Sequence, residues 1–176
     1  AESREQLTQP GAPFEYYEET LNGVVYKLYK QAPDTMREAL AAGRNHGEAM
    51  FLQYEGESWN FNQFFTSVDA IAYQLIHKYQ INKGDRVAIA MRNYPEWMMA
   101  YAAAISLGAV AVPINSWGQR DDLIYALTDS GASVVFTDQQ RYDFIANDLD
   151  ELNVRAVVAR PTAEISAANA ESYDSF

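Results

Sequence analysis

Residues 83–97 have the sequence KGDRVAIAMRNYPEW. The run 87–91 is apolar at every position, which is typical of a strand buried on both faces of a parallel sheet. Pro95 lies between Asn93 and Glu96, and this pattern predicts that a helix begins directly after the strand, with the two polar residues as its caps. The stretch therefore predicts a buried strand that leads straight into a helix.

The same order of strand and helix repeats toward the C-terminus. The helix that begins at Pro95 is apolar nearly all round, which predicts deep burial, and Gly108 ends it. Further strands are expected at 109–112, 133–137 and 154–159, and further helices at 120–129 and 141–152. Parallel strands joined by crossover helices predict an α/β fold, a doubly wound and mainly parallel sheet with helices on both faces.

A β-hairpin is predicted near the N-terminus. Asn22-Gly23 lies between two apolar and aromatic runs, and these residue types suit the positive φ angles of a two-residue hairpin turn. The resulting register places Glu18 opposite Lys27 and Tyr16 opposite Tyr29, which are favourable cross-strand pairs.

A second hairpin is predicted to turn at Gly56-Glu57, which would place Tyr54 opposite Trp59. A long amphipathic helix follows it. Asn60 and Gln63 have the spacing of a capping box at the start of this helix.

The chain divides into three predicted parts. Residues 1–13 are polar and are expected to form a flexible tail. Residues 14–160 are expected to form the α/β domain with its hairpins, including a short helix over 35–44. Residues 161–176 are polar and are expected to be a truncated linker or the start of the next element.

Composition excludes several classes of function. The 176 residues carry 13 Lys and Arg against 24 Asp and Glu, a formal charge of −11, so nucleic acid is not an expected partner. The chain has no cysteine, which excludes disulfides and thiolate chemistry, and its 2 histidines are too few for a histidine-rich metal site. No apolar run approaches the roughly 20 residues of a membrane-spanning helix, and the expected location is the cytoplasm.

Polar residues at the carboxyl ends of the predicted strands are the candidate ligand contacts. In doubly wound sheets ligands bind at this edge. Arg92 and Asn93 follow one strand, and Asn115 and Trp117 follow the next, so we take these four as substrate-side candidates. The sequence contains no Gly-rich phosphate loop, no nucleophile elbow and no metal-ligand spacing, so no catalytic, cofactor-binding or metal-binding residue is assigned.

An ordered series of short blocks resembles the opening of the adenylate-forming superfamily. That superfamily includes acyl-CoA synthetases, luciferases and peptide-synthetase adenylation domains, and the chain is most similar to long-chain fatty-acid-CoA ligases. The blocks lie at 59–61, 83–89, 92–97, 107–110, 112–115, 123–127, 129–132 and 134–138. The sequence departs from its relatives at Gln119, where they often have Thr as a helix cap.

The resemblance implies a function for a longer protein. Such enzymes use Mg-ATP to convert a carboxylic acid into an acyl-adenylate and then transfer the acyl group to CoA. The phosphate loop with its lysine and the adenine, ribose and C-terminal lysine motifs are absent from this sequence. We therefore expect the chain to be an inactive N-terminal part that needs the rest of its own enzyme. The isolated part would expose surface that the rest of the enzyme normally covers, so we expect it to self-associate.

Two alternatives remain open at this point. The chain could be a free-standing, flavodoxin-like binding module that acts by docking a partner. It could also belong to a fatty-acyl-AMP ligase that delivers its product to a carrier protein instead of CoA.

Overall fold

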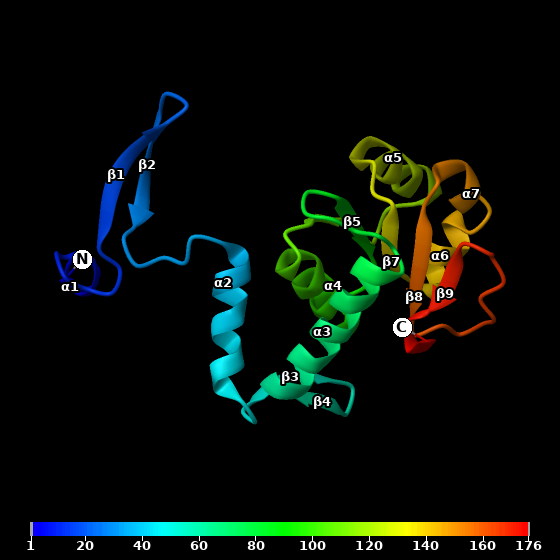
Figure 1. The fold of residues 1–176 in the computed structure, drawn as a ribbon, viewed down its shortest axis with the longest axis horizontal. Coiled ribbons are helices and arrows are strands. Elements are labelled where there is room, and N and C mark those ends of the chain that lie inside the picture. Colours follow the sequence, from blue (N-terminus) through cyan, green and yellow to red (C-terminus); the bar gives the residue numbers. More distant parts are fainter. Residues whose placement is uncertain (1, 176) are drawn as a thin grey trace. The chain divides into compact units, whose positions relative to one another are not determined.

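A five-stranded parallel sheet is the centre of the fold in the computed structural model, which describes residues 2–175 (Figure 1). The strand order is β6-β5-β7-β8-β9. The strands are β5 (Arg86–Ala90), β6 (Val110–Pro113), β7 (Val134–Asp138), β8 (Arg155–Ala159) and β9 (Ala170–Ser172). All neighbouring pairs are parallel, which confirms the predicted doubly wound sheet.

Helices cover both faces of this sheet. One face packs against α3 (Phe61–His77) and α4 (Pro95–Ser106), and the other packs against α5 (Arg120–Ser130), α6 (Gln139–Ile145) and α7 (Leu149–Leu152) (Figure 1). Alternation along β5 divides its side chains between the two cores, since Val87 and Ile89 lie in the first and Ala88 and Ala90 in the second. The apolar run is continuous because both of its faces are buried.

The helices on the first face follow the sequence pattern closely. Asn60 and Gln63 form the predicted capping box at the start of α3, with the Gln63 N–H donating to Asn60 Oδ1 at 2.8 Å. Deep burial of α4 is confirmed, because Ala100, Ala103 and Ala104 are fully buried against the sheet. Small side chains let this helix approach the strands closely.

One helix near the C-terminus differs from the prediction. The single helix expected over 141–152 is divided into α6 and α7 by a turn at 146–148. Of the two options stated for 161–176, the start of a further element agrees with the structure, because β9 pairs there with β8 and is followed by a 3-10 helix at Tyr173–Ser175. The strand Ala-Glu-Ser has little intrinsic strand preference. Long-range contacts hold it instead, since Glu171 accepts hydrogen bonds from Lys78 and Tyr79.

The second hairpin forms with a different register from the predicted one. It consists of β3 (Met50–Tyr54) and β4 (Glu57–Asn60). Tyr54 pairs with Glu57, and Trp59 lies opposite Leu52, so the predicted Tyr54–Trp59 pair is wrong. The turn is Glu55-Gly56, with φ angles of 44° and 89°. Glycine occupies the second turn position, which moves the turn one residue toward the N-terminus.

Residues 1–39 form a separate compact unit, and 40–176 form the other. The first contains α1 (Glu2–Thr8) and the hairpin of β1 (Tyr16–Leu21) and β2 (Val24–Tyr29). The hairpin has the predicted register, with Tyr16 opposite Tyr29 and Glu18 opposite Lys27.

The expected flexible tail at 1–13 instead contains the helix α1. The Phe14 N–H donates to the Leu7 carbonyl at 3.1 Å, and Ala12 is buried, so local contacts tie this segment to itself. The short helix predicted over 35–44 is α2 (Met36–Ala41), continued by a 3-10 helix at Ala42–His46.

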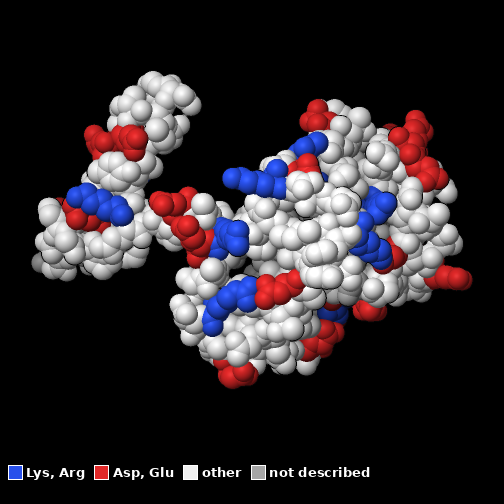
Figure 2. All heavy atoms as spheres, in the orientation of Figure 1, with Lys and Arg blue, Asp and Glu red and all other residues white. Residues whose placement is uncertain are grey.

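Figure 2 shows both acidic and basic side chains scattered over the face in view, with uncharged residues between them. Within the described part of the chain, the helices are all too short or too polar to cross a membrane.

Candidate functional site at the carboxyl edge of the sheet

The topological switch point of the sheet lies between β5 and β7. From β5 the chain runs outward through α4 to β6, then crosses back through α5 to β7 on the other side of β5. The loops that follow β5 and β7 consequently diverge at the carboxyl edge and leave a crevice, which is where open α/β sheets bind ligands. A cavity of about 400 Å³ lies there, lined by residues that include Arg92, Tyr94, Asp138, Gln139, Arg141 and Arg160.

A buried ion pair lies beside this cavity. Asp138 ends β7 and caps α6, because its Oδ1 accepts from the Arg141 N–H at 3.1 Å. The Arg141 guanidinium returns to the same carboxylate, with Nη1 at 3.0 Å from Oδ2. The two residues are only 4% and 5% exposed. Their remaining hydrogen bonds go to backbone atoms of the two neighbouring loops.

Arg92 and Trp117 are brought together by those two loops. The Arg92 guanidinium lies 3.8 Å from the centre of the Trp117 ring, a cation–π contact. Trp117 is nevertheless 73% exposed, so most of its indole faces solvent. Asn115 belongs to the same loop, where its Oδ1 accepts from the Trp117 N–H at 3.1 Å. Three of the four sequence candidates therefore belong to one arrangement at the carboxyl edge.

The prediction that Asn93 and Glu96 cap α4 is wrong. The N-cap of α4 is Tyr94, without a side-chain cap, although Pro95 does occupy the first turn as predicted. Asn93 instead lines an apolar groove of about 290 Å³, together with Leu52, Tyr54, Tyr94, Pro95, Trp97 and Met98. Asn93 is exposed and does not line the cavity beside Arg92, which adjoins the groove at Tyr94.

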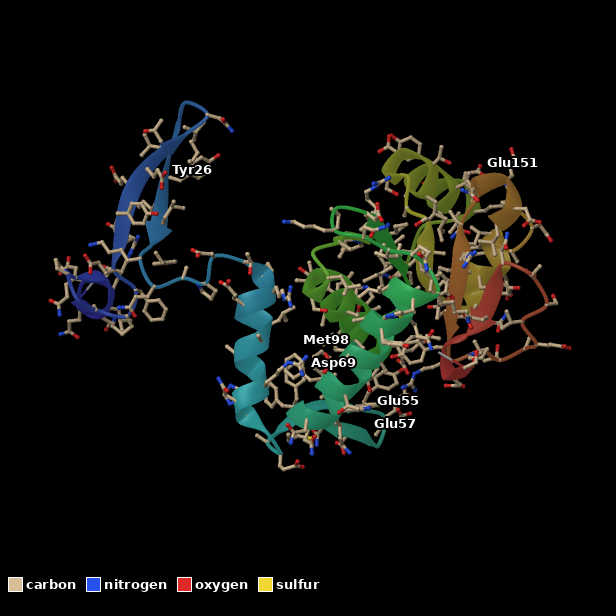
Figure 3. The ribbon with its side chains drawn as sticks, in the orientation of Figure 1. Tyr26, Glu55, Glu57, Asp69, Met98 and Glu151 are labelled. Atoms are coloured by element: carbon tan, nitrogen blue, oxygen red, sulfur yellow. The ribbon has the colours of Figure 1, made fainter. Side chains whose placement is uncertain are left out.

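Glu96 is paired with a residue that sequence reasoning did not single out. Arg160 directly follows β8, and its Nε lies 3.0 Å from Glu96 Oε1. Its Nη2 lies 2.8 Å from Oε2 of Glu57, which stands beside Glu55 at the tip of the β3–β4 hairpin (Figure 3). Arg160 thus links the hairpin to the start of α4. The signal for it in the sequence is weak, because Glu96 is 64 residues away.

The charges of this cluster stabilise one another. The hydrogen bonds that Arg160 donates to Glu57, and then to Glu96, raise its pKa above the ordinary value despite partial burial. The hydrogen bond from Arg160 lowers the pKa of Glu57 in return. Tyr54 and Tyr94 flank the guanidinium, with ring centres 4.8 and 5.5 Å away. The cluster is fully paired and serves to hold the edge together.

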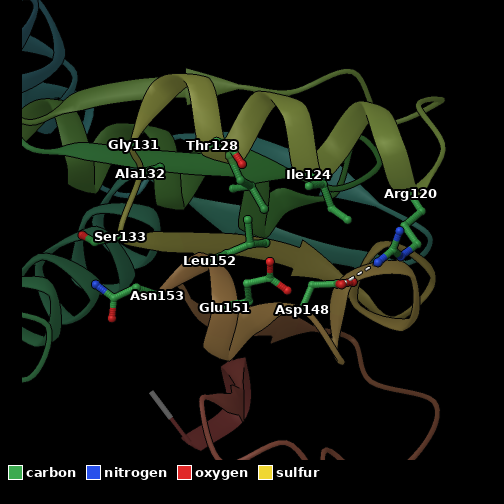
Figure 4. Close-up of a pocket in the computed structure, with 11 residues that line it drawn as sticks. Arg120, Ile124, Thr128, Gly131, Ala132, Ser133, Asp148, Glu151, Leu152 and Asn153 are labelled. Atoms are coloured by element: carbon green, nitrogen blue, oxygen red, sulfur yellow. Dashed lines mark hydrogen bonds and ion pairs between the residues drawn. The ribbon is translucent and has the colours of Figure 1, made fainter.

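A larger cavity of about 640 Å³ lies between α5 and α7, away from the carboxyl-edge crevice (Figure 4). An ion pair of Arg120 and Asp148, 2.5 Å apart, closes one end of it. Its walls combine polar side chains such as Thr128 and Glu151 with the apolar Leu152. Among the described residues, no three His, Cys, Asp or Glu side chains gather in a way that could hold a metal ion.

Comparison with known proteins identifies the family. The family model described as AMP-binding enzyme matches residues 39–175, most of the chain. The chain belongs to the AMP-binding enzyme family. The predicted resemblance to the N-terminal part of adenylate-forming enzymes is therefore confirmed.

Three similar proteins are each larger than this chain. A 2-succinylbenzoate–CoA ligase of Bacillus anthracis is 30% identical over 115 residues, which are 65% of this chain and 23% of that protein. The coronafacic acid ligase of Pectobacterium brasiliense superposes with a TM-score of 0.72 at 19% identity, over 80% of this chain and 28% of that one. A long-chain-fatty-acid–CoA ligase of Archaeoglobus fulgidus has a TM-score of 0.62 at 25% identity, over 74% and 28%. The AMP-binding chain thus spans about a quarter of these relatives.

Proposed function

We propose that this chain is part of an acid–CoA ligase, which joins a carboxylic acid to AMP with Mg-ATP and then transfers the acyl group to CoA. The observation that carries the proposal is the family match over 39–175, on a chain whose sheet has the doubly wound order. Each of the similar ligases is named after a carboxylic acid, and the acid differs from one ligase to the next. We propose a fatty acid as the substrate, because the sequence resembles long-chain fatty-acid-CoA ligases.

We propose that Arg92, Asn93, Asn115 and Trp117 lie on the substrate side of this enzyme. Arg92 supplies a positive charge that the Trp117 ring supports, and both line or adjoin the crevice at the carboxyl edge. Asn115 supports Trp117 from within its loop. Asn93 faces the neighbouring apolar groove, which suits contact with an apolar part of a substrate. The contacts to ATP and Mg²⁺ are expected outside these residues, because the sequence has no Gly-rich phosphate loop.

The rest of the same protein is the partner we propose for the N-terminal hairpin. One face of that hairpin presents Tyr17, Leu21, Val24 and Tyr26 to solvent, with exposed fractions of 43–52%. Apolar side chains gathered in this way usually mark a surface that another part covers. The cytoplasmic location stays a prediction.

Ligase activity is tested on the protein from the complete reading frame. It is incubated with ATP, Mg²⁺ and CoA and with 2-succinylbenzoate or fatty acids of several lengths, and pyrophosphate and CoA thioester are measured. We expect both products with at least one acid, and none from the 176-residue chain alone. Folded full-length protein that releases no pyrophosphate with any acid would reject the proposal.

The same assay separates the alternatives. A fatty-acyl-AMP ligase would accumulate acyl-adenylate and form no thioester when CoA is added. A stop codon directly after Phe176 would favour the free-standing binding module, whose flavodoxin-like strand order matches that of this sheet.

A further inference from the structure

One buried ion pair contacts both loops that carry the candidate ligand residues. Asp138 Oδ2 accepts from the backbone N–H of Arg92 at 2.9 Å, in the loop after β5. Arg141 Nε donates to the carbonyl of Ser116 at 2.7 Å, in the loop after β6. Arg141 Nη2 donates to the same carbonyl. The pair therefore holds the backbone of Arg92 on one side and that of the residue before Trp117 on the other.

Stability alone is a weak reason for such a pair. Removing two charges from water costs free energy that their attraction often only offsets, so apolar residues of similar size would serve equally well. Apolar residues could not, however, accept from the Arg92 N–H or donate to the Ser116 carbonyl. These two backbone bonds are the feature that requires a carboxylate and a guanidinium at 138 and 141. They fix the positions of two loops that have no direct strand pairing with each other at this point.

We propose that Asp138 and Arg141 are positioning residues that set the Arg92–Trp117 stack at the carboxyl edge. Trp117 is largely exposed and lies in a loop, so little packing holds its ring. The two backbone anchors therefore decide whether the guanidinium and the indole meet. The link from this stack to substrate binding rests on the proposed function, whereas the positioning of the stack does not.

The test labels the chain with 5-fluorotryptophan, since its 3 tryptophans give three resolvable fluorine signals. Trp117→Phe assigns one signal. Arg141→Lys keeps the charge but loses the forked donor group, and Asp138→Asn keeps the shape but loses the charge. We expect either variant to shift or broaden the Trp117 signal while the signals of Trp59 and Trp97 stay sharp. Arg160→Lys is the matched control, because it weakens another ion pair at the same edge and should leave the Trp117 signal unchanged.

The outcomes discriminate between positioning and simple stabilisation. Folded variants that melt at lower temperature but keep the native Trp117 signal would overturn the proposal. Should Arg141→Lys fail to fold, Asp138→Asn decides by the same signal, and Arg141→Gln adds a second substitution at 141. A Trp117 signal that moves equally in Arg160→Lys would also count against a specific role.

A second measurement connects the pair to binding in the full-length protein. We expect Arg141→Lys to raise KM for the acid or for CoA by about tenfold with kcat changed by less than about threefold, because the loss is one of ligand placement. An unchanged KM would show that the pair positions the two loops but does not affect substrate binding. Wild-type protein without ligase activity would reject the proposed function, while the fluorine result would stand on its own.

Discussion

Charges buried at the carboxyl edge are paired with partners from other elements. Glu96 is 9% exposed and meets Arg160, and the Asp138–Arg141 pair is buried further. An unpaired charge at these positions would lose its hydration without compensation. The loss in the free energy of unfolding when a pair is broken should therefore be larger for a more buried pair.

Arg160→Met should lower the free energy of unfolding by about 1–3 kcal/mol, because it leaves the Glu96 carboxylate without its partner. Urea denaturation measures this change. Asp69→Asn is the control at the exposed Arg44–Asp69 pair, where we expect a loss below about 1 kcal/mol. Equal losses at the two sites would contradict the view that burial decides. Adding Glu96→Gln to Arg160→Met should restore part of the stability.

Glu57 should make part of the stability depend on pH. Its pKa is lowered below 4.5 in the folded chain by the hydrogen bond from Arg160. A lowered folded-state pKa means that the contribution is present above the unfolded value and is lost as pH falls through the folded one. Glu57→Gln should thus flatten the fall in melting temperature between about pH 5 and about pH 3. If the melting temperature of Glu57→Gln falls with pH as steeply as that of the wild type, the ion pair is too well solvated to contribute to stability.

At the scale of elements, local caps define where the long helix begins. The side chain of Asn60 accepts from the Gln63 N–H, and Gln63 Oε1 accepts from the Asn60 N–H at 3.0 Å. Asn60 and Asn62 both also donate to the carboxylate of Glu48. The cap and the Glu48 contact can therefore be separated by mutation.

Asn60→Ala should lower the free energy of unfolding by about 1 kcal/mol, since an N-terminal N–H of α3 loses its acceptor. Chemical denaturation measures the loss. Asn62→Ala removes a contact to Glu48 without touching the cap and should have a smaller effect, whereas Asn60→Ser should retain most of the stability. A larger loss from Asn62→Ala would show that the Glu48 contact is the more important one.

At the scale of the molecule, both hydrophobic cores belong to one of the two compact units. The cluster around α3 and α4 and the cluster around α5, α6 and α7 lie entirely within residues 40–176. A chain of 40–176 should therefore fold alone, with a free energy of unfolding within about 1 kcal/mol of the whole chain. Cooperative unfolding by circular dichroism is the check. Loss of cooperativity in the shorter chain would show that the first unit supports the cores.

Self-association should depend on the first unit. The hairpin face with Leu21, Val24 and Tyr26 is the exposed apolar surface we expect copies to share. Sedimentation should show concentration-dependent association of the 176-residue chain, and Val24→Lys should reduce it. A solvent-exposed Tyr73→Lys change on α3 is the control. A clean monomer at high concentration would contradict this prediction.

The sequence determined the features whose causes are local. The apolar run at 87–91 predicts a doubly buried strand, Asn22-Gly23 predicts a turn and its register, and Asn60 with Gln63 predicts a cap. Each needs only a few adjacent residues, because side-chain period, turn chemistry and caps act over short distances. Together with the ordered blocks they were sufficient to predict the fold class and the family, and to direct attention to Arg92, Asn115 and Trp117.

Tertiary structure alone decided the features whose partners are distant in the chain. Arg160 meets Glu57 across 103 residues, and Lys78 meets Glu171 across 93 to hold the short strand β9. The Asp138 carboxylate reaches Arg92 across 46 residues. Such contacts depend on which loops the strand order brings to one edge, and no local pattern encodes that order. The sequence could therefore predict the sheet, whereas the pairs that hold its carboxyl edge in place appeared only once it was folded.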